Sequence, residues 1–143
     1  MPGKGNTLGC IATAAGIVAL TLAFSCKDSN PVGPDGSPSD VVFPADSVSY
    51  SQSVQVLFNQ TCALPSCHSS GEGVDRVKLD NYQNLRFGVN GLPVVIPGSP
   101  DQSELVLRIE GRTGDRMPIN RNPLNQNQIN GIRTWIAEGA KDN

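Results

Sequence analysis

The chain has 143 residues, a formal net charge of −2, and a composition of 38% hydrophobic and 5% aromatic residues. This length indicates a single domain. With 13 acidic against 11 basic residues, the chain has no cationic surplus of the kind that nucleic-acid binding requires, so that class of function is excluded. One tryptophan, two tyrosines and four phenylalanines supply few large side chains, and a small domain of this kind benefits from an additional stabilising element.

The first 25 residues read as an export signal of the lipoprotein type. Lys4 supplies an early positive charge, and an apolar run over residues 11–24 follows it. That run is too short to span a bilayer comfortably, so cleavage is favoured over a permanent helix. The sequence LAFSC, ending at Cys26, resembles a bacterial lipoprotein box and predicts a lipid anchor on that cysteine. An ordinary signal peptide cut nearby, or an uncleaved anchor, is the alternative.

Residues 26–46 are predicted to form a flexible linker, because proline, glycine, serine and aspartate dominate and almost nothing there can be buried. The folded domain is therefore expected over residues 47–143. With the signal before it, this domain is predicted to be exported and anchored to a membrane, in the bacterial periplasm or at the cell surface.

The first two predicted helices are short. One covers about residues 52–60, with Ser51 as its N-cap, and leads directly to Cys62. Its apolar face consists of Val54, Leu57 and Phe58. The second begins after Asp80, with Gln83 three residues later completing a capping box.

Two further helices are predicted in the second half of the chain. The third has Ser99 as N-cap and Pro100 at its first position. It carries Leu105, Val106 and Ile109. The last starts after Asn125, has Gln128 at its third position, and ends at Gly139. Its apolar stripe is Ile129, Ile132, Trp135 and Ile136.

Only residues 94–96, Val-Val-Ile, resemble a strand, and Pro97 ends that run. The loops between the helices are long and rich in glycine, proline and asparagine. The sequence therefore predicts an all-α domain of about four helices with long loops, an arrangement that can wrap a flat ligand.

The chain has four cysteines and one histidine. Cys10 lies in the leader and Cys26 is the predicted lipid site, so Cys62 and Cys67 are the two thiols of the mature domain. His68, the single histidine, directly follows Cys67. In an exported protein these two thiols experience an oxidising compartment.

A Cys…Cys-His sequence has the chemistry of a covalent haem attachment site. Two thiolates add across the vinyl groups, and a histidine next to the second cysteine reaches the iron. Here four residues separate Cys62 from Cys67, where two are usual. The extra residues must bulge outwards, and Pro65 is compatible with a bulge because it disfavours helix at the preceding residue. The insertion makes the attachment of Cys62 less certain than that of Cys67.

Two other interpretations of these residues remain open. A disulfide between Cys62 and Cys67 would close a small loop and is chemically accessible in an oxidising compartment. A structural zinc site is the poorer alternative, because such a site takes four ligands and the domain offers two cysteines and His68.

Apart from the initiator, Met117 is the sole methionine. It lies in the sequence DRMP, in a loop before the last helix rather than on an apolar helical stripe. That position favours a ligand over a gap-filling core residue, which is the alternative. Histidine and methionine together form the ligand pair of electron-transferring c-type haems.

Several further stretches carry a family resemblance. They are VIPGSP at 95–100, SEL at 103–105, RMP at 116–118 and IRTWIAEGA at 132–140. Together with the Cys…Cys-His loop, they resemble the planctomycete-type cytochrome c domains, within the monohaem cytochrome c family, over roughly residues 48–140.

The resemblance implies a cytochrome c-like fold around one covalently bound haem c. It implies His68 as the proximal iron ligand and Met117 as the distal one. It also implies that the first and last helices cross, through Phe58 and Trp135. Arg108 and Arg116 are the cations nearest these motifs and are candidates to pair with haem propionates; ordinary surface arginine is the alternative.

The predicted function is a membrane-tethered electron carrier and not an enzyme. The expected partners are a redox donor and acceptor, with the membrane bound through Cys26 and no nucleic acid. One alternative is a haem protein whose Met117 is labile, so that peroxide or a gas binds. The absence of a second histidine that could act as a distal acid or base speaks against this alternative. The other is a haem-free structural lipoprotein with a disulfide between Cys62 and Cys67.

Overall fold

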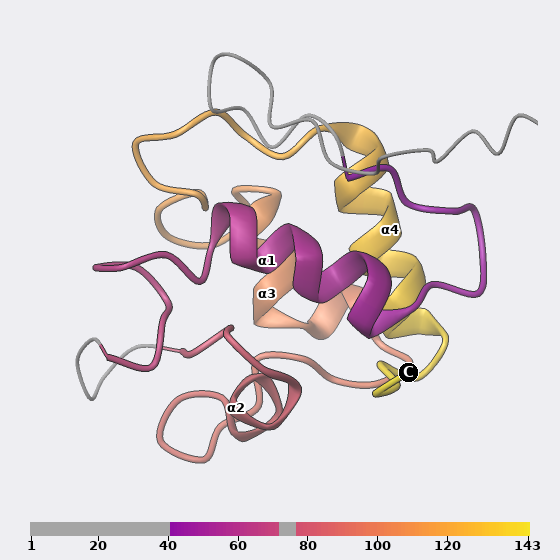
Figure 1. The fold of residues 1–143 in the computed structure, drawn as a ribbon, viewed down its shortest axis with the longest axis horizontal. Helices are drawn as coiled ribbons and strands as arrows, with labels where there is room; N and C mark the ends of the chain where they lie inside the picture. The colour runs from indigo at the N-terminus through magenta and orange to yellow at the C-terminus, as the bar shows by residue number, and fades with distance from the viewer. Residues whose placement is uncertain (1–40, 72–76) are drawn as a thin grey trace, which may run out of the picture.

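The computed structural model describes residues 41–71 and 77–143. Over these residues the chain is helical and contains no strand, which confirms the predicted all-α class (Figure 1). The predicted signal peptide, Cys26 and most of the predicted linker lie outside the described residues. The elements in chain order are the π-helical turn η1 (Tyr50–Val54), α1 (Gln55–Thr61), α2 (Tyr82–Phe87), the 3-10 turn η2 (Pro100–Gln102), α3 (Glu104–Ile109) and α4 (Gln126–Ala137).

The first helical segment begins earlier than predicted. The side chain of Ser49, not that of Ser51, caps it by accepting a hydrogen bond from the Gln52 amide at 3.2 Å. Ser51 is occupied elsewhere, because its amide and its hydroxyl both donate to the carbonyl of Asn143 at 2.9 Å. The predicted apolar face of this first helical segment, formed by Val54, Leu57 and Phe58, is fully buried.

Helix α2 is capped by Asn81, whose Oδ1 accepts from the Asn84 amide at 2.8 Å. The prediction of Asp80 as the cap is wrong by one residue. Its carboxylate instead accepts hydrogen bonds from Ser70 and from the Asn84 side chain, so it is not available to the helix.

Helix α3 also starts later than predicted. After Ser99, the chain makes only the 3-10 turn η2, and α3 begins beyond Ser103. The fully buried Ser103 hydroxyl donates to the Ser99 carbonyl at 2.9 Å and accepts from the Ile96 amide at 2.9 Å. These contacts, with a bond from the Leu105 amide to the Val94 carbonyl, pair residues 94–96 with the start of α3 rather than with a strand.

Helix α4 follows the prediction closely. Asn125 and Gln128 form the capping box, with hydrogen bonds of 3.0 Å in both directions. At the other end, Gly139 has a φ of +102° and its amide donates to Ile136, while the Ala140 amide donates to Trp135. This pair of bonds is a Schellman motif, in which a left-handed residue ends the helix.

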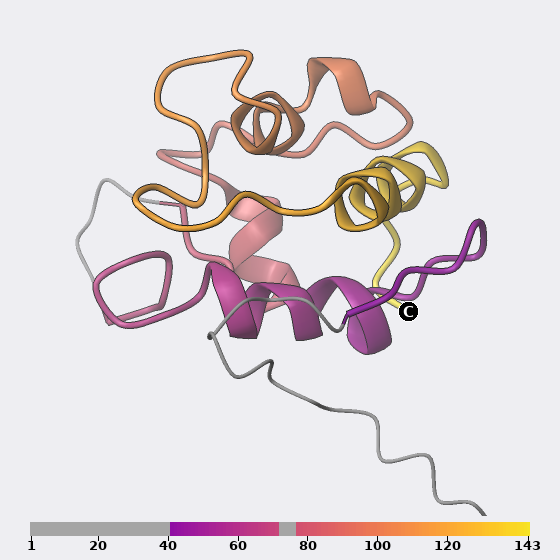
Figure 2. The ribbon, with the colours of Figure 1, turned by 90° about the horizontal axis from the view of Figure 1, so that it is seen from above.

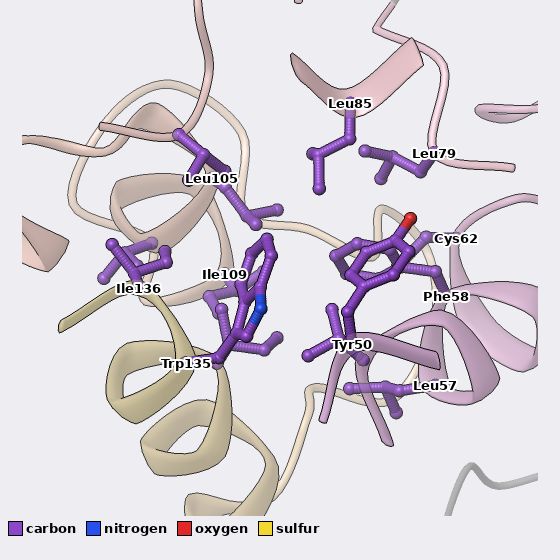
Figure 3. Close-up of a cluster of buried hydrophobic side chains, with 14 of the residues drawn as sticks. Tyr50, Leu57, Phe58, Cys62, Leu79, Leu85, Leu105, Ile109, Trp135 and Ile136 are labelled. Carbon is purple, nitrogen blue, oxygen red and sulfur yellow. The ribbon is translucent and has the colours of Figure 1, made fainter. Parts of the chain in front are cut away.

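Side chains from all four helices converge on one core (Figure 3). Trp135 of α4 and Tyr50 of η1 have ring centroids 5.5 Å apart, and Tyr50 meets Tyr82 edge to face at 5.1 Å. The first and last helical segments therefore make their aromatic contact through Tyr50, whereas the resemblance implied Phe58. Phe58 and Trp135 are both fully buried in the same core.

The N-terminal segment, residues 41–48, packs along α4, and we call it the strap. Phe43 is 3% exposed, and its amide and carbonyl both pair with the side chain of Asn127, at 2.8 and 3.1 Å. Its ring lies over Gly131, where a Cβ atom would overlap the ring. Val41 is buried as well, so the strap contributes to the core although most of its residues lie in the predicted linker.

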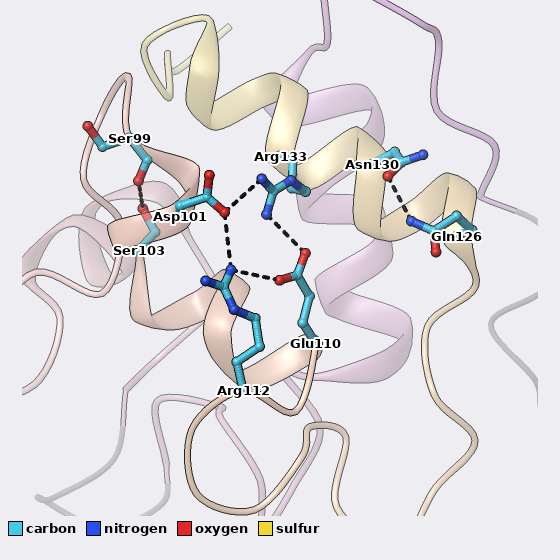
Figure 4. A network of polar contacts seen from close by, with 8 residues as sticks. All are labelled: Ser99, Asp101, Ser103, Glu110, Arg112, Gln126, Asn130 and Arg133. Carbon is cyan, nitrogen blue, oxygen red and sulfur yellow. Dashed lines mark hydrogen bonds and ion pairs between the residues drawn. The ribbon is translucent and has the colours of Figure 1, made fainter.

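A partly exposed network of four charged side chains ties η2 and the end of α3 to α4 (Figure 4). Arg133 of α4 pairs with Asp101 at 2.9 Å and with Glu110 at 3.0 Å. Arg112 pairs with the same two carboxylates, each at 3.1 Å. Because surface ion pairs each contribute little to stability, the network fixes orientation more than it adds stability.

Candidate haem site

The loop over residues 62–68 starts where α1 ends. Cys62 is the C-cap of α1, and its amide donates to the Phe58 carbonyl at 2.8 Å. The His68 amide donates back to the Cys62 carbonyl at 3.0 Å, so the two ends of the loop are neighbours. Ser66, within the bulge, adopts a left-handed φ of +66°. The four intervening residues thus form an outward turn, while Cys62, Cys67 and His68 remain on one closed loop.

The two thiols of this loop differ in their surroundings. Cys62 is 8% exposed, Cys67 is half-buried, and the two sulfur atoms are not bonded to each other. Burial raises the pKa of the Cys62 thiol to about 11. The Thr61 hydroxyl, which donates to the Leu57 carbonyl at 2.7 Å, lies 3.1 Å from the Cys62 sulfur. Cys62 is therefore a protonated thiol at neutral pH, and Cys67 is the more accessible of the two.

The imidazole of His68 is held in one tautomer. Its Nδ1 lies 2.9 Å from the carbonyl oxygen of Val77. A carbonyl can only accept, so a neutral ring carries its proton on Nδ1 and leaves the lone pair of Nε2 free. Metal-ligating histidines use this arrangement, in which a partner of the second nitrogen fixes the orientation of the ring. The donor set of the loop therefore fits a haem held by two thiols and one imidazole nitrogen.

Met117 lies in the long loop between α3 and α4. It is half-buried, packs against the core, and its amide donates to the Arg108 carbonyl at 3.0 Å. In Figures 1 and 2 this loop and the loop over residues 62–68 lie at the same end of the molecule, away from the C-terminus. Contact with the core suits a packing residue as well as a ligand, and the role of Met117 as a ligand stays a prediction.

The two candidate propionate partners differ. Arg108 already pairs with Glu104 at 2.6 Å, one helical turn before it. Arg116 is exposed and forms no ion pair with the described residues. Of the two, Arg116 is the one whose guanidinium is available, and the propionate contact stays a prediction.

Over residues 41–71 and 77–143, no three His, Cys, Asp or Glu side chains gather in a group that could hold a metal ion. None of the helices in this part of the chain has the length and apolar character needed to cross a membrane.

The interactions that hold His68 were missed at the sequence level. Its acceptor is a main-chain carbonyl, and a main-chain atom leaves no residue-type signal in a sequence. The polar cluster of Ser70, Asp80 and Asn84, beside the same loop, was missed too, because Asp80 matched a helix-capping pattern instead.

Comparison with known proteins gives one match. Residues 65–118 match the family described as Planctomycete cytochrome C. The match contains Cys67, His68 and Met117, and begins after Cys62. No curated protein and no solved structure matches the chain. Over residues 65–118 the match confirms the resemblance that the motifs predicted, and similarity to a cytochrome c family supports a covalently bound haem c.

Proposed function

We propose that this chain is a monohaem c-type cytochrome that passes single electrons between redox proteins. The observation that carries the proposal is the hydrogen bond from His68 Nδ1 to the Val77 carbonyl. It leaves the Nε2 lone pair of His68, the residue directly after Cys67, able to bind iron. It occurs within the segment that matches the planctomycete family. The loop thus combines two unbonded thiols with a histidine whose tautomer is fixed, and these are the groups that a haem-attachment loop requires.

Each residue of the site then has a distinct role. Cys62 and Cys67 would hold the haem as thioethers, with His68 as the proximal and Met117 as the distal iron ligand. When bound, the haem supplies an iron that gains and loses one electron. The Met117 thioether favours the ferrous state, and the carbonyl of Val77 keeps the imidazole in the ligating tautomer. The protein catalyses no reaction of its own.

The proposal places the domain behind a lipid tether. Lipidation of Cys26 would hold it at a bacterial membrane, with the linker giving it reach towards a donor and an acceptor in the periplasm or at the cell surface. The export signal predicted over residues 1–25 supports this location.

The variant Met117→Ala tests the hypothesis that Met117 is an iron ligand in an electron carrier. The variant should keep its haem, because the attachment loop is untouched. It should lose the weak sulfur-to-ferric-iron absorption at the near-infrared end of the visible spectrum, bind carbon monoxide in the ferrous state, and have a lower reduction potential. Val42→Ala, at an exposed apolar residue in the strap, is the matched control and should leave all three properties unchanged.

Other outcomes separate the alternatives. Carbon monoxide binding by the wild-type protein, with no change in Met117→Ala, would favour a haem protein with an open sixth position. A colourless wild-type protein made with a haem-maturation system would favour a haem-free lipoprotein with a disulfide between Cys62 and Cys67.

A further inference from the structure

Three polar residues next to the attachment loop form a closed cluster, which we call the Asp80 clamp: Ser70, Asp80 and Asn84. The Ser70 amide donates to Asp80 Oδ2 at 3.0 Å, and the Ser70 hydroxyl donates to the same oxygen. Asn84 Nδ2 donates to Asp80 Oδ1 at 2.7 Å and to Ser70 Oγ at 3.0 Å. The Ser70 and Asn84 hydrogen bonds lower the pKa of Asp80, so the clamp is built on a carboxylate.

The clamp joins two segments that also meet at His68. The Leu79 amide donates to the His68 carbonyl at 2.8 Å, and His68 Nδ1 reaches the Val77 carbonyl. Ser70 follows His68 by two residues, and Asp80 follows Val77 by three. The two segments are therefore joined at one end by the hydrogen bond from the His68 imidazole to Val77, and at the other end by the Asp80 clamp.

The segment that bears the Val77 carbonyl is fixed from the other side as well. Leu79 is 3% exposed within the core, and its carbonyl accepts a hydrogen bond from Gln55 of α1 at 3.0 Å. Between these core contacts and the clamp, the carbonyl has little freedom to turn away from the ring. The core contacts of Leu79 and the Asp80 clamp thus both restrict the Val77 carbonyl, which accepts the hydrogen bond from His68 Nδ1.

We propose that Asp80 is a positioning residue for the proximal ligand, acting through the Val77 carbonyl on the imidazole of His68. This inference rests on the proposed function. A firm hydrogen bond donated by Nδ1–H to the Val77 carbonyl raises the basicity of the imidazole, and a more basic ligand stabilises ferric iron. Loosening the clamp weakens that bond, so the reduction potential rises.

The test uses full-length holoprotein and three variants. Asp80→Ala removes both acceptor oxygens, and should raise the reduction potential and shift the paramagnetic NMR signals of the haem methyls and of the His68 ring. Asp80→Asn keeps one oxygen that can accept from Ser70, and should restore much of the wild-type behaviour. Asp46→Ala, at an exposed carboxylate in the strap, is the matched control and should match the wild type.

A purely structural clamp gives a different result. In that case Asp80→Ala would lower the melting temperature while the potential and the NMR signals stay at their wild-type values, and the inference would be overturned. If Asp80→Ala yields no holoprotein, Asn84→Ala replaces it, since it removes the amide that bridges Asp80 and Ser70, and the same two readouts decide. A wild-type protein that carries no haem would instead overturn the proposed function, which separates the two failures.

Discussion

The two ends of the molecule are built differently. At the end formed by the strap, α4 and the C-terminus, side chains of the protein itself hold the main chain. Asn127 pairs with Phe43, Glu138 accepts from the amides of Ser47 and Val48, and Asn143 accepts from that of Tyr50. We call this the terminal end.

At the other end, which we call the ligand end, the candidate ligands are on loops, namely the loop over residues 62–68 and the one that carries Met117. Large apolar side chains are exposed at both ends: Ile119, two residues after Met117, is 49% exposed, and Val42 of the strap is 75% exposed. The terminal end is therefore tied together by hydrogen bonds from side chains to the main chain, whereas the ligand end carries its two thiols, its imidazole and Met117 on loops, as the proposed haem site requires.

Removing the attachment residues should break the ligand end. His68→Ala or Cys67→Ala is expected to abolish stable holoprotein almost completely, because the first removes the iron ligand and the second the thioether next to it. Cys62→Ala, by contrast, should give a single-thioether form with a shifted visible spectrum. Yields and spectra after co-expression with a haem-maturation system measure both effects. Wild-type yields of haem protein from His68→Ala would contradict the assignment of the ligand.

Gly131→Ala should break the terminal end. In a helix interior, alanine in place of glycine ordinarily stabilises by up to about 1 kcal/mol. Here the added Cβ would overlap the Phe43 ring, and we expect a net loss of about 1–3 kcal/mol in the free energy of unfolding. Chemical denaturation measures it.

Two controls make the Gly131 prediction specific. In a Phe43→Ala background the same change should become neutral or stabilising, because the ring is gone. Gly71→Ala, where an added Cβ meets nothing within 4 Å, should have little effect. Equal losses with and without the Phe43 ring would show that the strap does not pack on Gly131.

The charged network between η2 and α4 should give the smallest effect. Asp101→Asn is expected to lower stability slightly at neutral pH and low salt, and the difference should vanish at high salt because the charges are exposed. The Arg133 and Arg112 hydrogen bonds lower the pKa of Asp101 below its ordinary value of 3.8.

The sign of the pH dependence follows from that shift. A carboxyl with a lowered folded-state pKa stabilises the fold above its unfolded value, and this contribution is lost as the pH falls through the folded value. The difference between wild type and Asp101→Asn should therefore be full above pH 3.8 and disappear well below it. A difference that persists in acid would mean that Asp101 acts through packing. Denaturation curves across pH and salt provide the measurement.

The sequence predicted those parts of the fold that depend on neighbouring residues. The capping box of α4 and its buried stripe involve residues three or four apart, so Asn125, Gln128 and Trp135 were assigned correctly. The apolar face of α1 was assigned correctly for the same reason. Of the site, the sequence supplied the four candidate residues, and the family match covers three of them.

The remaining features depend on contacts between distant residues. Ser51 was not the cap because it binds Asn143, 92 positions later. The packing of the strap on α4 was not predicted, because Phe43 packs on Gly131, and a glycine has no side chain that indicates such a contact in the sequence. The partner of His68 is a carbonyl, which any residue could have supplied. Local patterns cannot reveal contacts of this kind.

The most direct test of the account is the intact mass and visible spectrum of the wild-type protein made with a haem-maturation system. We predict a mass one haem above that of the processed polypeptide, a reduced-minus-oxidised spectrum of a c-type haem, and colour that stays with the protein after acid–acetone extraction. A colourless protein of polypeptide mass, with a disulfide between Cys62 and Cys67, would contradict the central claim.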